Sequence, residues 1–533
     1  MIVLRVVIGA LLPGYLHPDE FFQGGQELFF GCPPVIPWEF EPYNAVRSIV
    51  PPTLMTWLPL RLYSWITRTE MEQTSGMEIL LIPRIFCGFV SVLAVDVFVY
   101  LMTIRQQQSA TCSSSSKAPT SSMWIVATSW PAWVIGNRPF TNGFETMCLS
   151  MLLYMATRRH DILQSRNVVG DSCVGFLCAM GLFTRFTMVF FAMPVMIGYM
   201  IRNWYSIGGL LPITSCLAGF LITAGVIIVA DASYYGNVTH WSAFIAPWNA
   251  FLYNSKVDNL QHHGLHPRWT HAIVNMLMLF GPLALMFYSK LARDIYSRTV
   301  EHDVLQNACM WTIVCGLGFL SLAPHQEPRF LTPIMVPLAI VIGKTELWSS
   351  TRLRSIWVAF NLVFLGVFGI FHQGGIVPAL LSSAITRNEP PSVLFHHTYT
   401  PPSFLLRRVQ CTHDNVCSST SCPMTSVHDL MGSSGQNLAL ALQLALQCDK
   451  RAEKDNTYRH VHLVTPPLAF DHGMFFSTTS SSSSSTCSLG SEFSCEPIWV
   501  HWPHLTTEDF PVFEGMSGFI HGLKLTVYKV GCK

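Results

Sequence analysis

The chain has 533 residues, of which 50% are hydrophobic and only 12% are charged, and its formal net charge is +1. A soluble domain carries about 25% charged residues, so this composition disfavours a soluble enzyme and a disordered protein. A net charge near zero provides no basic field for a polyanion and disfavours nucleic acid as a partner. With a mean hydropathy of +0.37, the composition indicates a polytopic membrane protein.

Apolar segments recur along the first 373 residues and predict membrane-spanning helices. Several are shorter than the roughly 20 residues that a straight span requires, and 172–184 with 186–201 could form one broken span. The predicted segments are 1–13, 80–104, 123–136, 143–157, 172–184, 186–201, 207–231, 269–288, 305–323, 330–344 and 355–373.

The distribution of Lys and Arg predicts the orientation of these spans. If the N-terminus is cytosolic, alternate loops should carry the basic residues. Those loops contain Arg105, Lys117, Arg158, Arg159, Arg166, Arg202, Lys290, Arg293, Arg298, Lys344, Arg352 and Arg354. The loops 14–79, 232–268 and 324–329 are then lumenal, and Asn237-Val-Thr239 is a glycosylation sequon in one of them.

The composition changes near Phe371, and residues 374–533 are polar, with a Ser/Thr-rich insertion around Ser477–Ser488. Alternating apolar residues near the end predict a strand, so we expect a small, mostly β lumenal domain. Its cysteines suit disulfides in an oxidising lumen, and zinc binding is the rival interpretation, although no Cys-x-x-Cys pair occurs. They are Cys411, Cys417, Cys422, Cys448, Cys487, Cys495 and Cys532.

Two adjacent carboxylates, Asp19 and Glu20, follow His17 and Pro18 close to the first apolar segment. Ionisable residues at a membrane edge usually face a cavity or serve function. A carboxylate here could act as a general base on a sugar hydroxyl. The alternative is a helix start, because acids are favoured in the first turn of a helix.

A second polar cluster, His325-Gln326-Glu327-Pro328-Arg329-Phe330, forms a short loop between two predicted spans. An Arg guanidinium can bind phosphate oxygens with two parallel hydrogen bonds, so the cluster suits a phosphate-bearing ligand. The alternative is an ion pair of Glu327 with Arg329 that only stabilises the hairpin.

A third cluster contains His262, His263, His266 and Arg268. The histidine spacing is not that of a zinc protease and no acid lies close in sequence, so substrate contact or loop structure is favoured over a metal.

The turn Asn137–Glu145 and Arg185 are further polar positions at predicted span ends. Either can face a cavity, and the alternative for Arg185 is extension of its side chain to the membrane interface. No Walker A motif, Rossmann glycine fingerprint or Asp-x-Asp motif occurs.

These motifs resemble glycosyltransferase family 22, the polyprenol-dependent mannosyltransferases of the endoplasmic reticulum, which have a GT-C fold. The resemblance rests on the His17–Glu20 and His325–Phe330 runs and the many spans. Phe21-Phe22-Gln23 after the acid pair is similar to the GPI-anchor branch, and His263–His271 to its members that add the fourth mannose. The Asn137–Gly143 turn and the Phe371–Gly375 stretch are also similar, and the resemblance extends to about residue 408 and again over the last dozen residues.

The resemblance implies that dolichyl-phosphate-mannose donates mannose in the lumen, with inversion and without a metal. The acceptor would be the trimannosyl GPI precursor, joined through an α-1,2 linkage to its third mannose. Asp19 would be the base, with Glu20 as the fallback. The donor phosphate would contact His325 and Arg329, with Glu327 orienting Arg329. The expected acceptor contacts are His17, His266, Arg268, Asn137 and Arg138. No cofactor is implied besides the lipid-linked sugar donor.

We therefore expect an α-helical polytopic membrane protein with a GT-C fold and about eleven transmembrane helices in residues 1–373, followed by the lumenal domain 374–533. Another family 22 mannosyltransferase, acting on the third GPI mannose or on the N-glycan precursor, is the nearest alternative. A transporter or lipid flippase is disfavoured because, with Asp96 as an exception, the ionisable residues lie mainly at span ends and no internal repeat occurs. A non-catalytic scaffold subunit is a third alternative.

Overall fold

The computed structural model describes residues 2–532, and its contacts divide the chain into two compact units. The first unit contains Met1–Ala10, Ile36–Leu58 and Pro83–Val363, and the second contains Leu11–Val35, Pro59–Ile82 and Phe364–Lys533. The described range omits 33–34, 110–117, 159–166, 206–209, 237–243, 262–263, 299–300, 302, 387–391, 412–416, 422–425, 447–459, 468–475, 479–486, 490–492 and 507–515.

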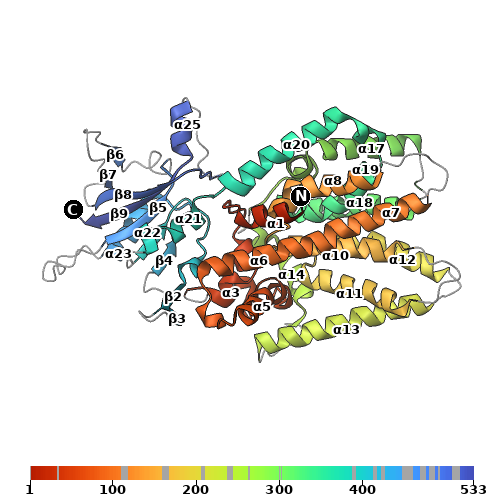
Figure 1. The fold of residues 1–533 in the computed structure, drawn as a ribbon, viewed down its shortest axis with the longest axis horizontal. Helices are drawn as coiled ribbons and strands as arrows, with labels where there is room; N and C mark the ends of the chain where they lie inside the picture. Colours follow the sequence, from red (N-terminus) through yellow and green to blue (C-terminus); the bar gives the residue numbers. More distant parts are fainter. Residues whose placement is uncertain are drawn as a thin grey trace. The chain divides into compact units, whose positions relative to one another are not determined.

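Helices build the first unit, and every predicted apolar segment contains one (Figure 1). They are α1 (Ile2–Leu11), η1 (Trp38–Phe40), α4 (Val50–Pro52), η2 (Thr53–Trp57), α6 (Gly76–Ser91), η4 (Val92–Asp96), α7 (Val97–Ser109), α8 (Ala118–Thr128), α9 (Trp130–Val134), α10 (Thr141–Ala156), α11 (Val168–Thr184), α12 (Met188–Trp204), α13 (Leu210–Tyr235), α14 (Ala246–Asn254), α15 (Val257–Gln261), η6 (His271–Asn275), α16 (Met276–Phe280), α17 (Pro282–Ser297), α18 (Val304–Leu322), η7 (Pro328–Ile334), α19 (Met335–Gly343), η8 (Glu346–Ser349) and α20 (Thr351–Gly366).

The lengths of these helices differ more than the sequence predicts. Among the described residues, four continuous helices are long and apolar enough to cross a membrane: Gly76–Gln108, Leu210–Tyr235, Val304–Leu322 and Thr351–Phe371. Shorter apolar helices cover Val168–Thr184, His271–Phe280 and Pro328–Gly343. The positions of the predicted segments are therefore confirmed, whereas the number of spans stays a prediction.

The segments 172–184 and 186–201 are two helices, as predicted, and the alternative of one broken span is wrong. Their helices α11 and α12 form an antiparallel pair in which the Tyr199 hydroxyl donates to Asp171 over 2.9 Å. The predicted 269–288 segment needs correction, because it is interrupted at Gly281, whose backbone φ of 43° separates the end of α16 from the start of α17 at Pro282. Glycine tolerates this backbone conformation, and proline is favoured at the first position of a helix.

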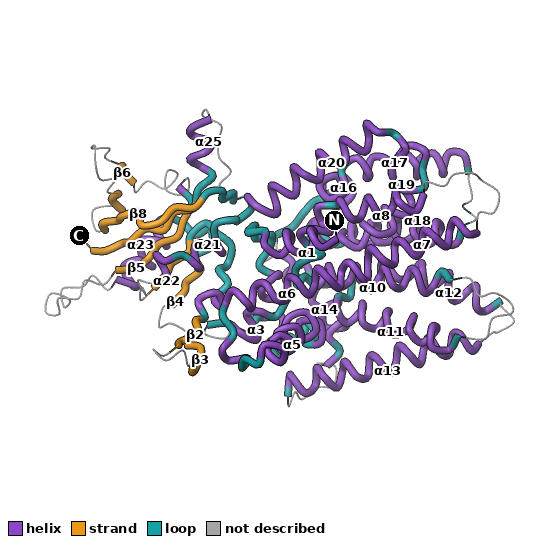
Figure 2. Tube along the Cα trace, viewed as in Figure 1, coloured by secondary structure: helices purple, strands orange, loops and turns teal. Residues whose placement is uncertain are grey.

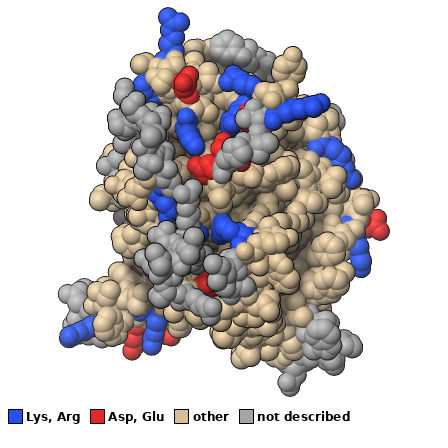
Figure 3. All heavy atoms as spheres, turned by 90° about the vertical axis from the view of Figure 1, so that its right-hand side faces the viewer, with Lys and Arg blue, Asp and Glu red and all other residues tan. Residues whose placement is uncertain are grey.

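The helix ends predicted on the cytosolic side lie together at one end of the first unit. The Lys344 ammonium, after α19, is 3.3 Å from the Asp303 carboxylate, before α18. Arg105 of α7 and Arg202 of α12 both donate to carbonyls at the end of α10. We call this the basic end, because Lys and Arg side chains are spread across the surface there (Figure 3). Helices that begin here, such as α11 and α18, finish at the opposite end, which we call the site end.

A mixed β-sheet organises the second unit (Figure 2). Its seven strands lie in the order β4-β1-β5-β9-β8-β7-β6, with β1 parallel to β4 and β5 and the other pairs antiparallel. The strands are β1 (Ser392–Phe395), β4 (Ser426–Asp429), β5 (His460–Thr465), β6 (Phe476–Thr478), β7 (Cys487–Leu489), β8 (Phe493–His501) and β9 (Leu525–Cys532), beside a separate hairpin of β2 (Arg408–Cys411) and β3 (Cys417–Ser421).

The predicted boundary between 373 and 374 differs from the division in the structure. Residues of the predicted lumenal loop, such as Tyr15 and Phe21, share one buried apolar core with Phe404 and with Val393 of the sheet. The segment 11–35 contributes the short helices α2 (Asp19–Phe22) and α3 (Gln26–Phe30), and 59–82 contributes part of α5 (Leu58–Thr67). Burial of these apolar side chains against the sheet stabilises the grouping.

The second unit contains helices as well as the predicted strands. The described helices beside the sheet are α21 (Ile376–Leu381), α22 (Ser383–Thr386), α23 (Gly435–Leu446) and α25 (Met516–Gly522). Cys495 and Cys532 are disulfide-bonded, and so is Cys32, which the sequence did not single out. Cys422, Cys448 and most of the Ser-rich insertion lie outside the described residues.

Candidate functional site

The loop between α18 and η7 places the second predicted cluster at the site end. The His325 Nδ1 atom lies 2.9 Å from the Gly264 carbonyl oxygen, and its Nε2 atom lies 2.8 Å from Glu327 Oε1. Because both neighbours are acceptors, a doubly protonated ring satisfies both contacts. Burial lowers the pKa of His325, but the hydrogen bond and the charge of Glu327 outweigh it, so the pKa lies above its usual range. His325 is therefore biased toward the cation.

Glu327 joins the two cations of this loop. Its second carboxylate oxygen accepts a hydrogen bond from Arg329 Nε. The predicted ion pair of Glu327 with Arg329 is thus present, and it also includes His325. Two cations share one carboxylate, which leaves an excess positive charge in the loop when His325 is protonated.

The third predicted cluster packs directly against this loop. The His266 backbone N–H donates to the Pro324 carbonyl over 2.8 Å, and the His266 Nδ1 atom accepts from the Gln326 backbone N–H over 3.3 Å. The His266 and His325 ring centres are 5.8 Å apart. Arg268 is exposed and donates to the Leu322 carbonyl at the end of α18. Two motifs that are far apart in sequence therefore form one surface.

Gln326 holds the two motifs together, and the sequence reasoning assigned it no role. Its side chain is 1% exposed. The amide nitrogen donates to the Ser321 and Ala323 carbonyls, each over 3.0 Å, and the amide oxygen accepts from the His271 backbone N–H over 2.7 Å. Asn275 extends the network with a 3.0 Å contact to the His271 ring. The position of Gln326 inside the polar His325–Phe330 run is the sequence feature that could have indicated this role.

A third cation, Arg185, lies beside the loop. Its Nε atom is 3.7 Å from a Glu145 carboxylate oxygen, and its Nη1 atom donates to the Thr141 hydroxyl over 3.1 Å. The Arg185 and Arg329 guanidinium carbons are 4.9 Å and 5.6 Å from the centre of the Phe330 ring. Arg185 is 7% exposed, so the structure favours the buried alternative over extension to the membrane interface.

Asn137 and Arg138 lie within the helix packing of the first unit. The Asn137 amide donates to the Arg5 carbonyl over 2.6 Å, and the side chain is fully buried. A Cβ atom added to Gly9 would meet the Asn137 amide at 1.7 Å, so α1 approaches this turn closely. Arg138 is also buried. Their role in acceptor binding stays a prediction, and packing accounts for the position of Asn137.

The acid pair opens α2 in the second unit, as the helix-start interpretation predicts. The Asp19 carboxylate accepts a hydrogen bond from the Gln23 amide and lies 3.3 Å from His17 Nδ1. The Asp19 side chain is 16% exposed, whereas Glu20 is completely buried. Of the two acids, Asp19 is the one that a ligand can reach.

No group of three or more His, Cys, Asp or Glu side chains is arranged to hold a metal ion in the described part of the chain. His262 and His263 of the third cluster lie outside that part, as does the sequon residue Asn237.

Comparisons with known proteins show the family of the chain. The model of the Alg9-like mannosyltransferase family matches residues 1–406. GPI mannosyltransferase 4 of Aspergillus oryzae is 30% identical, and the match covers 96% of this chain and 93% of the relative. The protein of the same name from Saccharomyces cerevisiae is 28% identical over 87% of this chain and 88% of the relative.

A solved structure shows the same fold. The crystal structure of ArnT from Cupriavidus metallidurans bound to undecaprenyl phosphate matches with a TM-score of 0.50 and 10% sequence identity. The match covers 90% of this chain and 95% of that chain. The predicted GT-C fold, with apolar helices and a C-terminal β-sheet domain, is confirmed.

Proposed function

Because the chain belongs to the Alg9-like mannosyltransferase family, it is a mannosyltransferase, and we propose that it adds the fourth mannose to the GPI-anchor precursor. The observation that carries this proposal is the near full-length similarity to GPI mannosyltransferase 4 of Aspergillus oryzae. The proposed reaction transfers mannose from dolichyl-phosphate-mannose to the third mannose of a trimannosyl GPI precursor. The new bond is an α-1,2 linkage, formed with inversion.

The His325–Arg329 loop is the proposed contact for the donor phosphate. The phosphate monoester is the leaving group, so its negative charge grows as the glycosidic bond breaks. Cations held in place before the reaction stabilise such charge effectively, because they need no reorganisation. His325 and Arg329 supply two cations, Glu327 orients them, and Arg185 adds a third nearby. This set of cations supports a leaving group that departs without a metal.

Asp19 is the proposed general base. An inverting transfer needs one base on the acceptor hydroxyl, opposite the leaving group. The partial exposure of Asp19 and the orienting contacts from His17 and Gln23 suit this role. Glu20 is the fallback, which its complete burial disfavours.

The accessible residues His17, His266 and Arg268 are the proposed acceptor contacts. Their imidazole and guanidinium groups can donate hydrogen bonds to sugar hydroxyls and phosphates. Asn137 and Arg138 are less suited, because both are buried.

The proposed location is the membrane of the endoplasmic reticulum, with the site end facing the lumen. Lys and Arg gather at the basic end of the first unit (Figure 3), and the positive-inside rule assigns that end to the cytosol. The loops of the site end then face the opposite compartment, where a disulfide such as that of Cys32 is stable.

Mannose transfer in microsomes tests this proposal. The microsomes come from a host that lacks its own fourth-mannose enzyme, and they receive labelled dolichyl-phosphate-mannose with a trimannosyl GPI acceptor. We expect transfer by the wild type and a loss of about 10²- to 10⁴-fold in Asp19→Asn, the usual contribution of a general base. Asp294→Asn is the control, because Asp294 pairs with Lys290 on α17.

Each outcome separates one part of the proposal. Full activity of Asp19→Asn with loss in Glu20→Gln would move the base to Glu20. Transfer to a dimannosyl but not to a trimannosyl acceptor would indicate the third-mannose reaction instead. No transfer by well-folded wild-type protein to either acceptor would contradict the proposed function.

A further inference from the structure

A groove runs between α8 and α20 in the first unit, and none of the predicted site residues lines it. Its volume is about 730 Å³, and its walls come from α8, η8 and α20. The Trp357 indole N–H donates to the Thr128 hydroxyl over 2.9 Å. The ring centre of Trp348 lies 5.9 Å from that of Trp124 and 6.3 Å from that of Trp357. These contacts hold the two helices together, so the groove is a stable feature of the packing.

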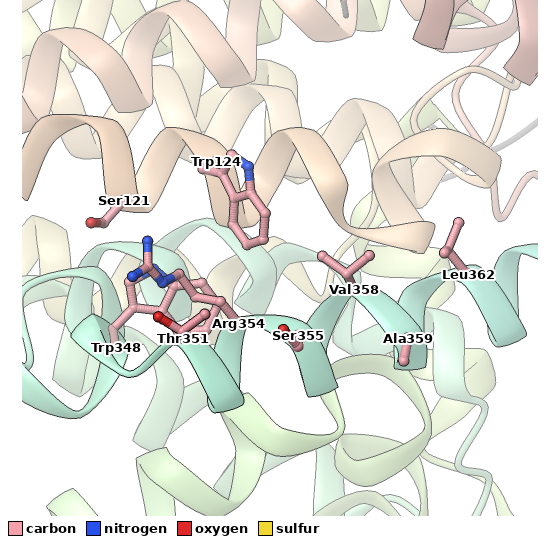
Figure 4. A pocket seen from close by; sticks show the side chains of 9 residues that line it. All are labelled: Ser121, Trp124, Trp348, Thr351, Arg354, Ser355, Val358, Ala359 and Leu362. Carbon is pink, nitrogen blue, oxygen red and sulfur yellow. The ribbon is translucent and has the colours of Figure 1, made fainter.

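The two ends of the groove differ in chemistry (Figure 4). Ser121, Thr351 and the Arg354 guanidinium lie at one end, whereas Val358 and Leu362 lie at the other. A ligand that fills the groove therefore has a polar head and an apolar body.

The polar end of the groove lies at the basic end of the first unit. A Cβ atom added to Gly343, the last residue of α19, would meet Ser122 of α8 at 2.2 Å. Lys344 follows directly and is 3.3 Å from Asp303, one of the contacts that define the basic end. The groove therefore extends from the membrane surface at this end toward the membrane interior.

The charge at the polar end favours an anion. The Arg354 guanidinium donates to the Ser349 carbonyl over 2.9 Å and pairs with no carboxylate within the described part of the chain. Between 344 and 354, Lys344 pairs with Asp303, and the other two cations, Arg352 and Arg354, stand against one acid, Glu346. The guanidinium geometry matches phosphate oxygens.

The apolar end of the groove is open to lipid. Leu362 is 63% exposed, and only 17% of the most apolar 18-residue stretch of the Thr351–Phe371 helix is buried within the protein. In a membrane this surface contacts hydrocarbon chains rather than water. Trp124, which is partly exposed in the groove, is of the residue type that is enriched at the level of lipid headgroups.

We propose that this groove binds one anionic glycerophospholipid from the leaflet at the basic end. Arg354, with the Ser121 and Thr351 hydroxyls, binds the phosphate-bearing headgroup, and an acyl chain lies along Val358 and Leu362. The bound lipid fills the space between α8 and α20 and stabilises their arrangement. The groove contains no residue of the His325–Arg329 loop, and lipid binding there does not depend on mannose transfer.

Native mass spectrometry of the purified full-length protein tests this proposal. The protein is solubilised in a neutral detergent and offered phosphatidylserine, phosphatidylcholine or dolichyl phosphate. We expect wild type to retain one phosphatidylserine in preference to the other two lipids. Arg354→Gln should reduce its apparent affinity about tenfold, the scale of a lost hydrogen bond to a charged group. Ala359→Trp, which fills the groove at an exposed position, should also reduce retention.

Arg352→Gln is the matched control, because Arg352 is an exposed arginine of the same helical turn that does not line the groove. Its retention of phosphatidylserine should equal that of wild type. The thermal unfolding midpoint of wild type should rise with added phosphatidylserine, and that of Arg354→Gln should rise less. Equal retention by wild type and Arg354→Gln, equal loss in Arg352→Gln, or preference for dolichyl phosphate would each overturn the proposal.

Discussion

The two ends of the first unit use the same residue types in different ways. At the basic end, Arg105 and Arg202 donate to backbone carbonyls at the end of α10, and Lys344 pairs with a partly exposed carboxylate. Cations near a helix C-terminus satisfy free carbonyls and favour one orientation in the membrane. At the site end, Arg185 and Arg329 are buried, Arg185 beside the buried Glu145 and Arg329 beside the partly buried Glu327.

The difference between the ends concerns the cost of burial. A buried charge is stable only with a partner, so each cation of the site end depends on its acid and on the loop that positions it. An exposed cation can lose its contact with little effect. Three helices carry comparable residues at both ends, and these pairs allow the comparison to be tested.

Helix α12 provides the pair with the largest expected effect. Arg185 precedes this helix at the site end, and Arg202 lies near its other terminus. Arg185→Met should lower the free energy of unfolding by about 3–5 kcal/mol, because it leaves the Glu145 charge buried without its partner. Arg202→Met should cost about 1 kcal/mol, the value of a lost hydrogen bond. Chemical unfolding in detergent micelles measures both.

A second substitution separates charge from shape in that experiment. Glu145→Gln in the Arg185→Met background removes the buried charge and should restore most of the lost stability. If the double variant is no more stable than Arg185→Met, the cost arises from packing instead of from the unpaired acid.

Glu27 in the second unit is a buried acid that is held by a hydroxyl and a backbone N–H group. Burial raises its pKa from the usual 4.5 to about 7, although the Ser403 hydroxyl and the Phe404 backbone N–H donate to it. A raised pKa favours the protonated form, so its stabilisation is complete below pH 4.5 and is lost as the pH rises through about 7. Each tenfold change in proton affinity, or one pKa unit, corresponds to about 1.4 kcal/mol. The free energy of unfolding should therefore fall by about 3 kcal/mol over this pH range.

Thermal unfolding across this pH range measures the effect of Glu27. Glu27→Gln should remove most of the slope between pH 4.5 and 7, because the amide does not titrate. A slope that is unchanged in Glu27→Gln would assign it to another group.

The segment η7–α19 provides the pair for activity. Arg329 lies in its first turn at the site end, and Lys344 follows it at the basic end. Arg329→Gln should reduce mannose transfer about 10²-fold, the effect of losing one donor that stabilises developing charge. Lys344→Gln should leave transfer within about twofold, because a surface ion pair contributes little. Equal losses in the two variants would contradict the assignment of the phosphate contact.

Helix α18 provides the pair with the smallest expected effect. Gln326 follows it at the site end, while Gln306 lies in its first turn and donates to the Ile340 carbonyl over 3.1 Å. Gln326→Leu should reduce transfer about tenfold by loosening the loop, since buried hydrogen-bonded groups are worth about 1 kcal/mol or more each. Gln306→Leu should lower stability without a specific loss of transfer. Steady-state kinetics together with unfolding of both variants distinguish positioning from general destabilisation.

Local patterns in the sequence predicted much of this protein. Apolar runs located the long helices of the first unit, because lipid solvation depends on the composition of a short segment and not on its neighbours. They did not locate α14 and α15, which lie in the predicted loop 232–268. The Lys and Arg distribution predicted which helix ends lie together, and the contacts of Lys344 and Arg105 confirm it. The His325 and His266 clusters were identifiable in the sequence as candidate sites, because imidazole and guanidinium groups occur close together in each short stretch.

Contacts between distant segments were decided only by the tertiary structure. No local pattern shows that Tyr15 and Phe21 pack with the C-terminal sheet, that Gln326 joins two motifs, or that the promising turn residue Asn137 is buried against α1. Burial of an apolar core and satisfaction of buried polar groups depend on partners that are far away in the sequence. The sequence by itself therefore determined which apolar segments form helices and which residues are candidates for the chemistry, because both depend on local composition. The tertiary structure decided which of those candidates are accessible and which are buried, because burial depends on distant partners.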